Sequence, residues 1–224
     1  MKELLAGVVR ADEAIAATVR DGMTLMVGGF GLVGAPLTLI RALNASPWTG
    51  LTVISNNLGE PGKGLGETFR LGKVRRAIGS FFTSNPEVGA AYAQGKIEVT
   101  LLPQGTFSEA IRAGGAGLGG FYTPTGVGTL LAEGKEVREF DGKAYLLQEP
   151  LRADVALVRA HKADEMGNLV YYKTARNFNP IMATAAATVI AEVDEVVGVG
   201  QLDPETIGTP HLFVDYLVVA EEKL

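Results

Sequence analysis

The chain has 224 residues, 47% of them hydrophobic, a formal net charge of −5 at pH 7 and no cysteine. This composition excludes disulfides, thiolate nucleophiles and Cys-ligated metals, the negative charge argues against a nucleic-acid partner, and no apolar run approaches the roughly 18 residues of a membrane span. We expect a cytoplasmic protein with a single domain over residues 1–224 and a sizeable core.

The first half of the chain alternates continuous apolar runs, which predict buried strands, with amphipathic segments, which predict helices. Helix starts are indicated by Asp12, Asn85 and Thr106 as N-caps, the last with Glu109 at a capping-box spacing, and by Pro36 at a first helical position. In chain order, the predicted elements are a helix at 11–22, a strand at 23–27, a helix at 36–46, strands at 51–55 and 74–81, a helix at 85–95, a strand at 97–103 and a helix at 106–115.

The second half of the chain favours strands. Residues 136–148 predict a hairpin of two short strands around Asp141-Gly142. Residues 155–173 predict a second strand pair, and buried strands are expected at 188–193 and 212–220. Together with the first half, this order predicts an α/β fold with an open, mostly parallel sheet, helices on both faces and a small antiparallel hairpin element.

The most informative glycine cluster is GGFGLVGAP at 28–36, which from Gly29 matches the dinucleotide-binding pattern G-x-G-x-x-G. A dinucleotide site also needs an acidic residue where the second strand ends, to hold the ribose. That strand ends in Ser55-Asn56-Asn57 instead. An NAD-binding oxidoreductase therefore stays an alternative without its key partner, beside a purely structural glycine turn.

A longer pattern is more specific. DGMTLMVGGFGLVGAP (21–36) resembles the signature of the alpha subunits of family I CoA-transferases: Asp-Gly, two residues, three apolar residues, Gly-Gly-Phe, three residues, Gly, one residue and Pro. The resemblance extends over nearly the whole chain and implies a CoA-transferase or ribose-phosphate-isomerase-like fold. It is closest to the alpha subunits of short-chain 3-oxoacid and acetate (acetoacetyl-CoA) CoA-transferases. Further similar segments are SNN (55–57), LLPQGTFSEAIRAGGAGLGGFYTPTGVGT (101–129), LRADVALVRAHKADEMGNL (151–169) and ARNFNP (175–180).

The resemblance implies transfer of coenzyme A from an acyl-CoA to a carboxylic acid through a glutamyl-CoA thioester. It places the nucleophilic glutamate on a beta subunit, in a Ser-Glu-Asn-Gly context that this chain lacks. Glu60, Glu67 and Glu109 lie in turn or helical contexts and are not expected to be the nucleophile. We expect a heterodimer or heterotetramer with a beta subunit, and no cofactor or metal beyond the coenzyme A thioester that is the substrate.

The expected acyl-CoA site is the glycine loop, where backbone N–H groups precede a helix N-terminus and suit an oxyanion or the pantetheine arm. Phe30 either packs on that arm or anchors the loop. The predicted CoA-binding residues are Gly28, Gly29, Phe30, Gly31, Leu32, Val33 and Gly34.

The expected substrate-binding residues follow two other strands. Ser55, Asn56 and Asn57 end one strand, and Gln104 follows another. The carboxyl ends of parallel strands meet at one sheet edge, so the neutral amides of Asn56, Asn57 and Gln104 are expected to bind the substrate carboxylate and support catalysis. The alternatives are turn formation by the asparagines and helix capping by Gln104.

Several assignments stay open. Lys162, Arg176 and Asn177 are expected to meet either the CoA phosphates or the partner, while His161 and His211 lack metal or triad spacing and are expected to be structural.

The glycine-rich residues 113–129 form either a wall of the cleft or a subunit interface. The leading substrates are succinyl-CoA or acetyl-CoA with acetoacetate. The alternatives are a 3-oxoadipate or an acetate/butyrate CoA-transferase, and, from other classes, the oxidoreductase or a non-catalytic CoA-binding or assembly module.

Overall fold

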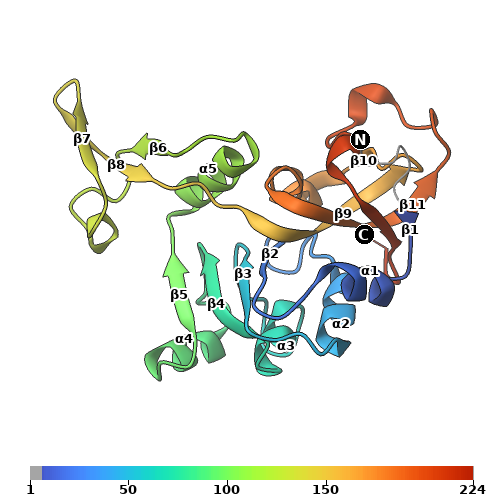
Figure 1. Ribbon diagram of the computed structural model, residues 1–224, viewed down its shortest axis with the longest axis horizontal. Helices are drawn as coiled ribbons and strands as arrows, with labels where there is room; N and C mark the ends of the chain where they lie inside the picture. Colours follow the sequence, from blue (N-terminus) through green and yellow to red (C-terminus); the bar gives the residue numbers. More distant parts are fainter. Residues whose placement is uncertain (1–6, 224) are drawn as a thin grey trace.

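The computed structural model describes residues 7–223, which form one twisted main sheet with helices packed on both of its faces (Figure 1). Within these residues the sheet has nine strands in the order β1-β12-β11-β9-β2-β3-β4-β5, with β10 paired to β9. Among the described strands of this main sheet, only the β9–β10 pairing is antiparallel. The predicted open, mostly parallel sheet is therefore confirmed. The strands are β1 (Gly7–Val8), β2 (Thr24–Val27), β3 (Leu51–Ile54), β4 (Val74–Gly79), β5 (Glu98–Leu101), β9 (Ala153–Asp164), β10 (Leu169–Val170), β11 (Ala186–Val197) and β12 (Tyr216–Val219).

The strand order reverses between β2 and β9. From β2 the chain adds β3, β4 and β5 on one side, and β9, β11 and β12 then build the other side. Open α/β sheets bind ligands beyond the carboxyl ends of their strands at such a reversal. The carboxyl end of β2 is therefore the position where the fold itself favours a site.

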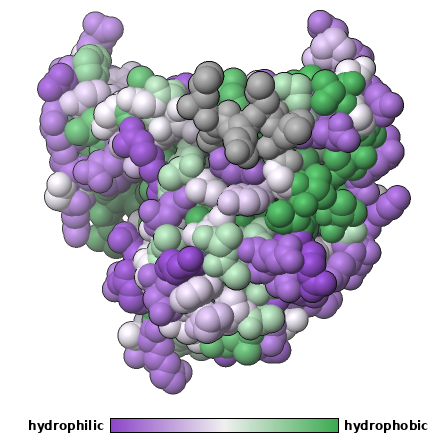
Figure 2. Space-filling view, turned by 45° about the vertical axis from the view of Figure 1, so that its right-hand side comes forward, coloured by the Kyte–Doolittle hydropathy of each residue, from purple (hydrophilic) through white to green (hydrophobic). Residues whose placement is uncertain are grey.

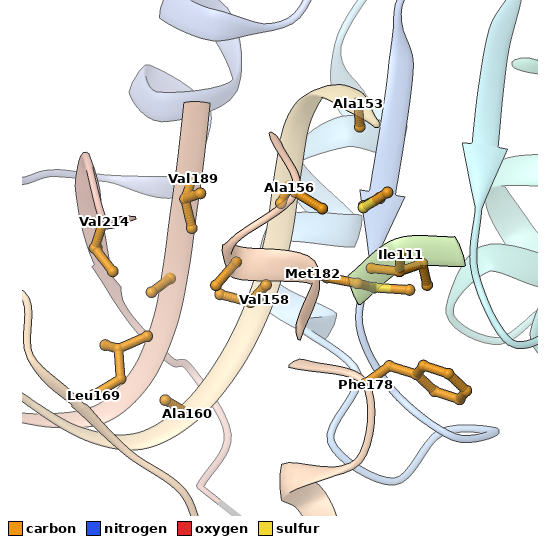
Figure 3. Packing of buried hydrophobic residues seen from close by; sticks show 14 of the residues in the cluster. Ile111, Ala153, Ala156, Val158, Ala160, Leu169, Phe178, Met182, Val189 and Val214 are labelled. Atoms are coloured by element: carbon orange, nitrogen blue, oxygen red, sulfur yellow. The ribbon is translucent and has the colours of Figure 1, made fainter. Parts of the chain in front are cut away.

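Two hydrophobic clusters, one on each face, hold the helices to the sheet. Neighbouring residues of a strand point to opposite faces, and β2 shows this directly: Leu25 and Val27 belong to the cluster with α1 to α4, whereas Met26 belongs to the cluster with α5 and α6. Figure 3 shows Ile111 of α5 beside Met182 of α6 in the second cluster. The helices are α1 (Ala11–Thr18), α2 (Leu37–Ala45), α3 (Leu65–Arg70), α4 (Pro86–Ala93), α5 (Gln104–Gly115) and α6 (Asn179–Ala183).

A second, three-stranded antiparallel sheet projects away from the main sheet beyond α5 (Figure 1). It consists of β6 (Phe121–Thr123), β7 (Val137–Phe140) and β8 (Lys143–Gln148) in the order β6-β8-β7. Asp141 and Gly142 have φ angles of 49° and 73°. Positive φ at both central residues matches the right-handed twist of a two-residue hairpin, so the predicted hairpin is confirmed.

Two predicted helix starts differ from the structure, and a third is confirmed. Arg10 rather than Asp12 is the N-cap of α1, because the guanidinium of Arg10 holds the Asp12 carboxylate at 3.0 Å and Glu13 accepts from the Arg10 backbone. Pro36 is the N-cap of α2 instead of its first residue. Asn85 caps α4 as predicted, and its Oδ1 accepts from the backbone N–H of Glu87 in the first turn at 3.2 Å.

The start of α5 is also displaced. The helix begins at Gln104, with Pro103 as N-cap, so Thr106 lies inside the first turn and is buried rather than capping. Glu109 pairs with Arg112 at 2.6 Å and forms no capping box. Pro103 sets this earlier start because its φ of −55° already suits a helix. As a result, Gln104 belongs to a rigid helical turn.

None of the described helices has the length and apolar character needed to cross a membrane.

On the face that carries β1 and β11, polar and apolar residues are interspersed, with one apolar area at the right of the view (Figure 2).

A buried ion network ties β9, β11 and residue 222 together. Arg159 on β9 is 2% exposed and donates to Glu192 at 3.0 Å, to Asp194 and to the backbone carbonyl of Glu222 at 2.9 Å. Asp194 also contacts Nδ1 of His161 at 2.8 Å. Burial raises the pKa of Glu192, while the backbone N–H of Leu39 and the Arg159 charge act in the opposite direction. Arg159 is therefore the cation that makes two buried carboxylates tolerable.

We expect Arg159→Met to lower the free energy of unfolding by about 3–5 kcal/mol, because it leaves those carboxylates buried without their cation. Arg41 provides a matched control, since its half-exposed guanidinium pairs with Glu221 at 2.8 Å, and Arg41→Met should cost less than about 1 kcal/mol. Urea unfolding followed by circular dichroism measures both. Equal losses for the two variants would contradict this role of Arg159.

Candidate functional site

Loops from four neighbouring strands meet at the carboxyl edge of the main sheet. The glycine loop (residues 28–35) follows β2 at the reversal of strand order, Ser55-Asn56-Asn57 follows β3, Ser80 follows β4, and Gln104 begins α5 after β5. The structure therefore brings together both predicted sets of residues, the glycine loop and the polar strand ends, on the side of the sheet where the fold favours a ligand.

The glycine loop is a tight turn closed on itself. Phe30 and Val33 exchange backbone hydrogen bonds of 3.0 and 3.2 Å. Gly29, Gly31 and Gly34 have φ angles of 115°, 62° and 68°, a region that side chains disfavour. The glycines are thus required first by the path of the backbone.

Close packing adds a second requirement at Gly28 and Gly34. A Cβ on Gly28 would lie 1.8 Å from Oδ1 of Asn179, and one on Gly34 would lie 2.5 Å from the carbonyl oxygen of Ala175. A Cβ on Gly31 would have no neighbour within 4 Å. Gly31 is therefore the loop glycine that faces open space, whereas Gly28 and Gly34 serve packing.

Asn179 fastens the loop to the sheet. Its side chain is fully buried, and Nδ2 donates to the carbonyl oxygens of Gly34 and Ala175 at 3.0 and 2.9 Å. Its Oδ1 accepts from the backbone N–H of Arg159 at 2.8 Å. Arg159 lies between the end of the β2 pairing at Leu157 and the start of the β10 pairing at Lys162, where β9 has no strand on that side, so the Asn179 amide replaces the missing ladder partner.

Asn177 holds the other side of the loop. Its Oδ1 accepts from the N–H of Gly29 at 3.1 Å, and its Nδ2 donates to the carbonyl oxygen of Val33 at 3.0 Å. Between the two asparagines, Phe178 packs edge-on against Phe107 in the core. Asn177 was expected to meet CoA phosphates or a partner, but the structure uses both of its amide atoms inside the protein. Asn179, which was not among the predicted site residues, also holds the glycine loop through its side-chain amide.

The loop offers fewer N–H donors than the sequence suggests. Among the seven residues 28–34, four backbone amides are already bonded inside the protein, namely those of Gly28, Gly29, Phe30 and Val33. Residues 7–223 provide no acceptor for three others, those of Gly31, Leu32 and Gly34. The predicted run of seven donors is therefore corrected to the N–H groups of Gly31 and Leu32 at the tip of the turn, because Gly34 is buried against Ala175.

The N-terminus of α2 is not open to an anion either. The N–H of Leu39 donates to Oε2 of Glu192 at 3.0 Å, and that contact is buried. A carboxylate thus already occupies the position where a Rossmann helix would receive a pyrophosphate. This corrects the expectation that the helix N-terminus serves a ligand, and it contradicts the NAD-binding alternative.

The side chains of the loop tip point in different directions. Phe30 and Val33 are each about half exposed, at 49% and 52%. The expectation that Phe30 anchors the loop in the core is therefore wrong, and its ring is accessible to a ligand. Leu32 turns toward the neighbouring loop, where a Cβ on Gly64 would lie 3.0 Å from its side chain.

The polar strand ends form a chain of amides. The N–H of Gly59 donates to Oδ1 of Asn57 at 2.8 Å, and Nδ2 of Asn57 donates to Oδ1 of Asn56 at 2.9 Å. Nδ2 of Asn56 then donates to Oγ of Ser80 at 3.0 Å and to Oε1 of Gln104 at 3.3 Å. Asn56 and Asn57 are buried, whereas Gln104 is exposed.

The predicted substrate-binding residues thus divide into two kinds. Ser55 is buried and donates to the carbonyl oxygen of Val27 at 2.8 Å. Both amide atoms of Asn56 and of Asn57 are bonded within the chain of amides. Only Gln104 presents an amide to solvent, and its Nε2 has no acceptor among the described residues. Gln104 is therefore the member of the set that can reach a ligand without rearrangement.

A hollow of about 420 Å³ opens beside this edge. One side is the start of α5, and the other is β6 with the residues that follow it. Its lining includes Pro103, Thr106, Tyr122 and Thr125. Phe121, Tyr122, Thr123 and Thr125 of the segment 113–129 therefore line a hollow against the start of α5, whereas Gln104 does not line it. The choice between a cleft wall and a subunit interface stays a prediction.

Two of the three carboxylates considered as nucleophiles, Glu60 and Glu109, are paired with cations. Glu60 pairs with Lys63 at 3.6 Å, and Glu109 pairs with Arg112, which lowers the pKa of its carboxyl. Glu67 lies in the first turn of α3, away from the amide chain in sequence and without a salt bridge among the described residues. The assembled polar groups are donors rather than free carboxylates.

The other residues whose roles were left open from the sequence have different surroundings in the structure. Lys162 pairs with Glu195 at 2.8 Å, whereas Arg176 is exposed and has no anionic partner within residues 7–223. His161 belongs to the buried ion network. The N–H of His211 donates to Oδ1 of Asn168 at 2.9 Å. No group of three potential metal ligands occurs in the described part of the chain.

We expect Gly28→Ala to lower the free energy of unfolding by about 3 kcal/mol, because the new Cβ displaces the Asn179 amide and breaks its buried hydrogen bonds. Gly31→Ala is the matched control and should cost about 1 kcal/mol, the strain of a left-handed alanine. Thermal or urea unfolding of both variants measures the difference. A cost for Gly31→Ala that equals or exceeds the cost for Gly28→Ala would contradict this assignment of the two glycines.

Comparison with known proteins identifies what the chain resembles. Residues 8–220 match the family described as Coenzyme A transferase. The A subunit of succinyl-CoA:3-ketoacid coenzyme A transferase from Xanthomonas campestris pv. campestris (strain B100) is 52% identical over 93% of this chain and 86% of the relative. The alpha subunit of acetate CoA-transferase from Escherichia coli (strain K12) is 50% identical over 91% and 92%. The A subunit of 3-oxoadipate CoA-transferase from Pseudomonas putida is 52% identical over 92% and 91%.

A solved structure shares the fold. The acyl-CoA transferase apoenzyme from Escherichia coli O157:H7 superposes with a TM-score of 0.87 at 25% identity, covering 100% of this chain and 49% of that chain. A thioester complex of the same enzyme with CoA gives a TM-score of 0.86 at 25% identity, over 98% and 48%. The chain therefore spans about half the length of that enzyme.

Proposed function

The chain belongs to the coenzyme A transferase family, and on that premise we propose that it is the alpha subunit of a short-chain 3-oxoacid CoA-transferase. In this proposal the chain binds the acyl-CoA and the acid at the carboxyl edge of its sheet. A beta subunit completes the site and supplies the glutamate that becomes a CoA thioester.

The proposed reaction has two half-reactions. The partner's glutamate carboxylate attacks the thioester carbonyl, the C–S bond breaks, and an acyl-glutamyl anhydride and CoA thiolate result. The thiolate attacks the glutamyl carbonyl, the anhydride C–O bond breaks, and the first acid leaves with a glutamyl-CoA thioester behind. The same steps in reverse transfer CoA to the second acid. Each attack places negative charge on a carbonyl oxygen, which needs hydrogen-bond donors.

One observation carries the proposal: what this chain presents at the site is donors. The exposed amide nitrogen of Gln104 and the N–H groups of Gly31 and Leu32, which are partly exposed, have no acceptor among the described residues. Neutral donors suit a substrate carboxylate that must react, because an ion pair would hold it too firmly. The carboxylates Glu60 and Glu109 are paired with cations, and Glu67 lies in the first turn of α3 rather than in the chain of amides, so we assign the nucleophile to the partner.

The proposal of a partner rests on two further findings. The relatives are named as A or alpha subunits, and the chain spans 49% of the acyl-CoA transferase that it superposes on. We assign the other half of the site to a beta-type chain, in a heterodimer or heterotetramer. The cytoplasmic location, which the cysteine-free composition predicts, remains part of this proposal.

The acid pair is the most open part of the proposal. Relatives named for 3-ketoacid and for 3-oxoadipate transfer are both 52% identical to this chain, so identity does not choose between them. We propose acetoacetate with succinyl-CoA or acetyl-CoA as the primary pair. 3-Oxoadipate and acetate with butyrate are the alternatives to assay beside it.

We expect the purified chain to fold but to show no CoA transfer, and the complex with its beta-type partner to transfer CoA with ping-pong kinetics. Release and consumption of acyl-CoA with each acid pair measures this, with circular dichroism as the control for folding. Turnover by the isolated chain would contradict the divided site. CoA binding without turnover by the complex would favour a non-catalytic binding module instead.

A further inference from the structure

The chain of amides at the strand ends has a direction, and the direction begins at a backbone group. A side-chain amide carries an acceptor oxygen and a donor nitrogen of nearly the same size, so its neighbours decide which way it faces. A backbone N–H can only donate. The N–H of Gly59 therefore requires that the atom of Asn57 facing it, at 2.8 Å, is the oxygen.

This choice propagates through the two buried residues that follow. With its oxygen toward Gly59, Asn57 turns its nitrogen to Asn56, at 2.9 Å from Oδ1. Asn56 then has its nitrogen left for Ser80 and Gln104, at 3.0 and 3.3 Å. Turning either amide over would bring two oxygens or two NH₂ groups together where water cannot relieve the mismatch, because Asn56 and Asn57 are 1% and 5% exposed.

The last link fixes what the site presents. Oε1 of Gln104 faces inward and accepts from Asn56. Its Nε2 then faces outward, and residues 7–223 offer it no acceptor. Reversing the chain would present an oxygen at the same place, which a carboxylate or a developing oxyanion would repel.

The starting point is itself rigid. Gly59 has a φ of 61°, and a Cβ there would lie 2.5 Å from the carbonyl oxygen of Lys63 and 2.6 Å from the N–H of Gly66. The backbone bridge between Glu60 and Lys63 closes this second glycine loop in the same way that Phe30 and Val33 close the first. The Gly59 N–H is thus held in one orientation.

We propose that Asn57 is a positioning residue for the transfer reaction: through Asn56 it transmits the polarity of the Gly59 N–H to Gln104, so that the site offers a donor to the carboxylate or thioester oxygen of its substrate. This inference rests on the proposed function for the identity of the ligand. The direction of the chain rests on the hydrogen bonds alone.

Asn57→Asp reverses the chain with almost no change of shape. A carboxylate at this position accepts from Gly59 and can only accept from Asn56, which must turn its nitrogen inward and its oxygen toward Gln104. Gln104 then donates inward and presents Oε1 to the site. A donor site for a carboxylate becomes an acceptor site, which suits a primary amide.

The experiment measures dissociation constants of butyrate and butyramide for the assembled complex by calorimetry, which requires no turnover. In Asn57→Asp, we expect butyrate to bind about 10-fold or more weakly and butyramide to bind more tightly than in the unchanged complex. Asn85→Asp is the matched control. Asn85 is also buried and donates to the carbonyl oxygen of Leu58 at 3.1 Å, but its amide has no link to Gln104.

Simple charge repulsion and a polarity reversal give different results. Repulsion weakens butyrate binding and leaves butyramide unchanged, in both Asp variants, and would overturn the proposal. Should Asn57→Asp fail to fold, Asn56→Asp tests the last link in the same way, and no gain in butyramide binding there would also overturn it. A gain in either variant, absent from Asn85→Asp, supports the proposal.

The two proposals can fail separately. Reversal of the ligand preference in a complex that transfers no CoA to any acid would retain the amide chain and reject the proposed function. CoA transfer by a complex whose ligand preference does not change would retain the function and reject the role of Asn57.

Discussion

The site depends on one buried amide. Beyond the end of β2, the side of β9 that faces away from β11 has no strand partner until β10 pairs with it at Lys162 and Ala163, and the side chain of Asn179 takes this hydrogen-bonding position while holding the glycine loop with its nitrogen. Because Gly28 lacks a Cβ, the loop can approach this amide closely enough for the contact. The loop tip, with its unbonded N–H groups, is therefore presented from a fixed base at the reversal of strand order.

Elsewhere at this edge of the sheet, too, backbone N–H groups are already bonded within the protein. The N–H of Leu39 at the start of α2 is taken up by Glu192, and the Glu192 charge is balanced by Arg159. Fold stability and site chemistry therefore share β9 and β11, since the Arg159 side chain balances the buried charge while the Arg159 backbone occupies the ladder position that Asn179 completes. What remains for a ligand is a short set of neutral donors. Such a set can stabilise charge that develops on an oxygen, but it contains no nucleophile, and the proposed function therefore assigns the nucleophile to a second chain.

How much of this the sequence can predict follows from the range of each interaction. The alternation of strands and helices, the hairpin at Asp141-Gly142 and the meeting of strand ends are local patterns or general properties of parallel sheets, and they are confirmed. The helix α3 has only six residues and begins after Gly64 with a φ of 54°, so no capping signal marks it. The contacts of Asn179 with the loop and of Glu192 with α2 join residues 145 and 153 positions apart, and no local pattern reveals them. For the same reason the sequence overstates the donors of the glycine loop: a count of N–H groups cannot show which of them distant side chains already use.

The central claim is that this chain supplies donors and walls while its partner supplies the nucleophile. The most direct measurement is the position of the covalent intermediate. The complex would be incubated with acyl-CoA in the absence of an acceptor acid, trapped with hydroxylamine or borohydride, which react with a thioester and spare an ordinary carboxylate, and separated into its chains for mass spectrometry. We expect a modified glutamate on the partner and an unmodified chain here. A modification on Glu60, Glu67 or Glu109 of this chain would contradict the claim.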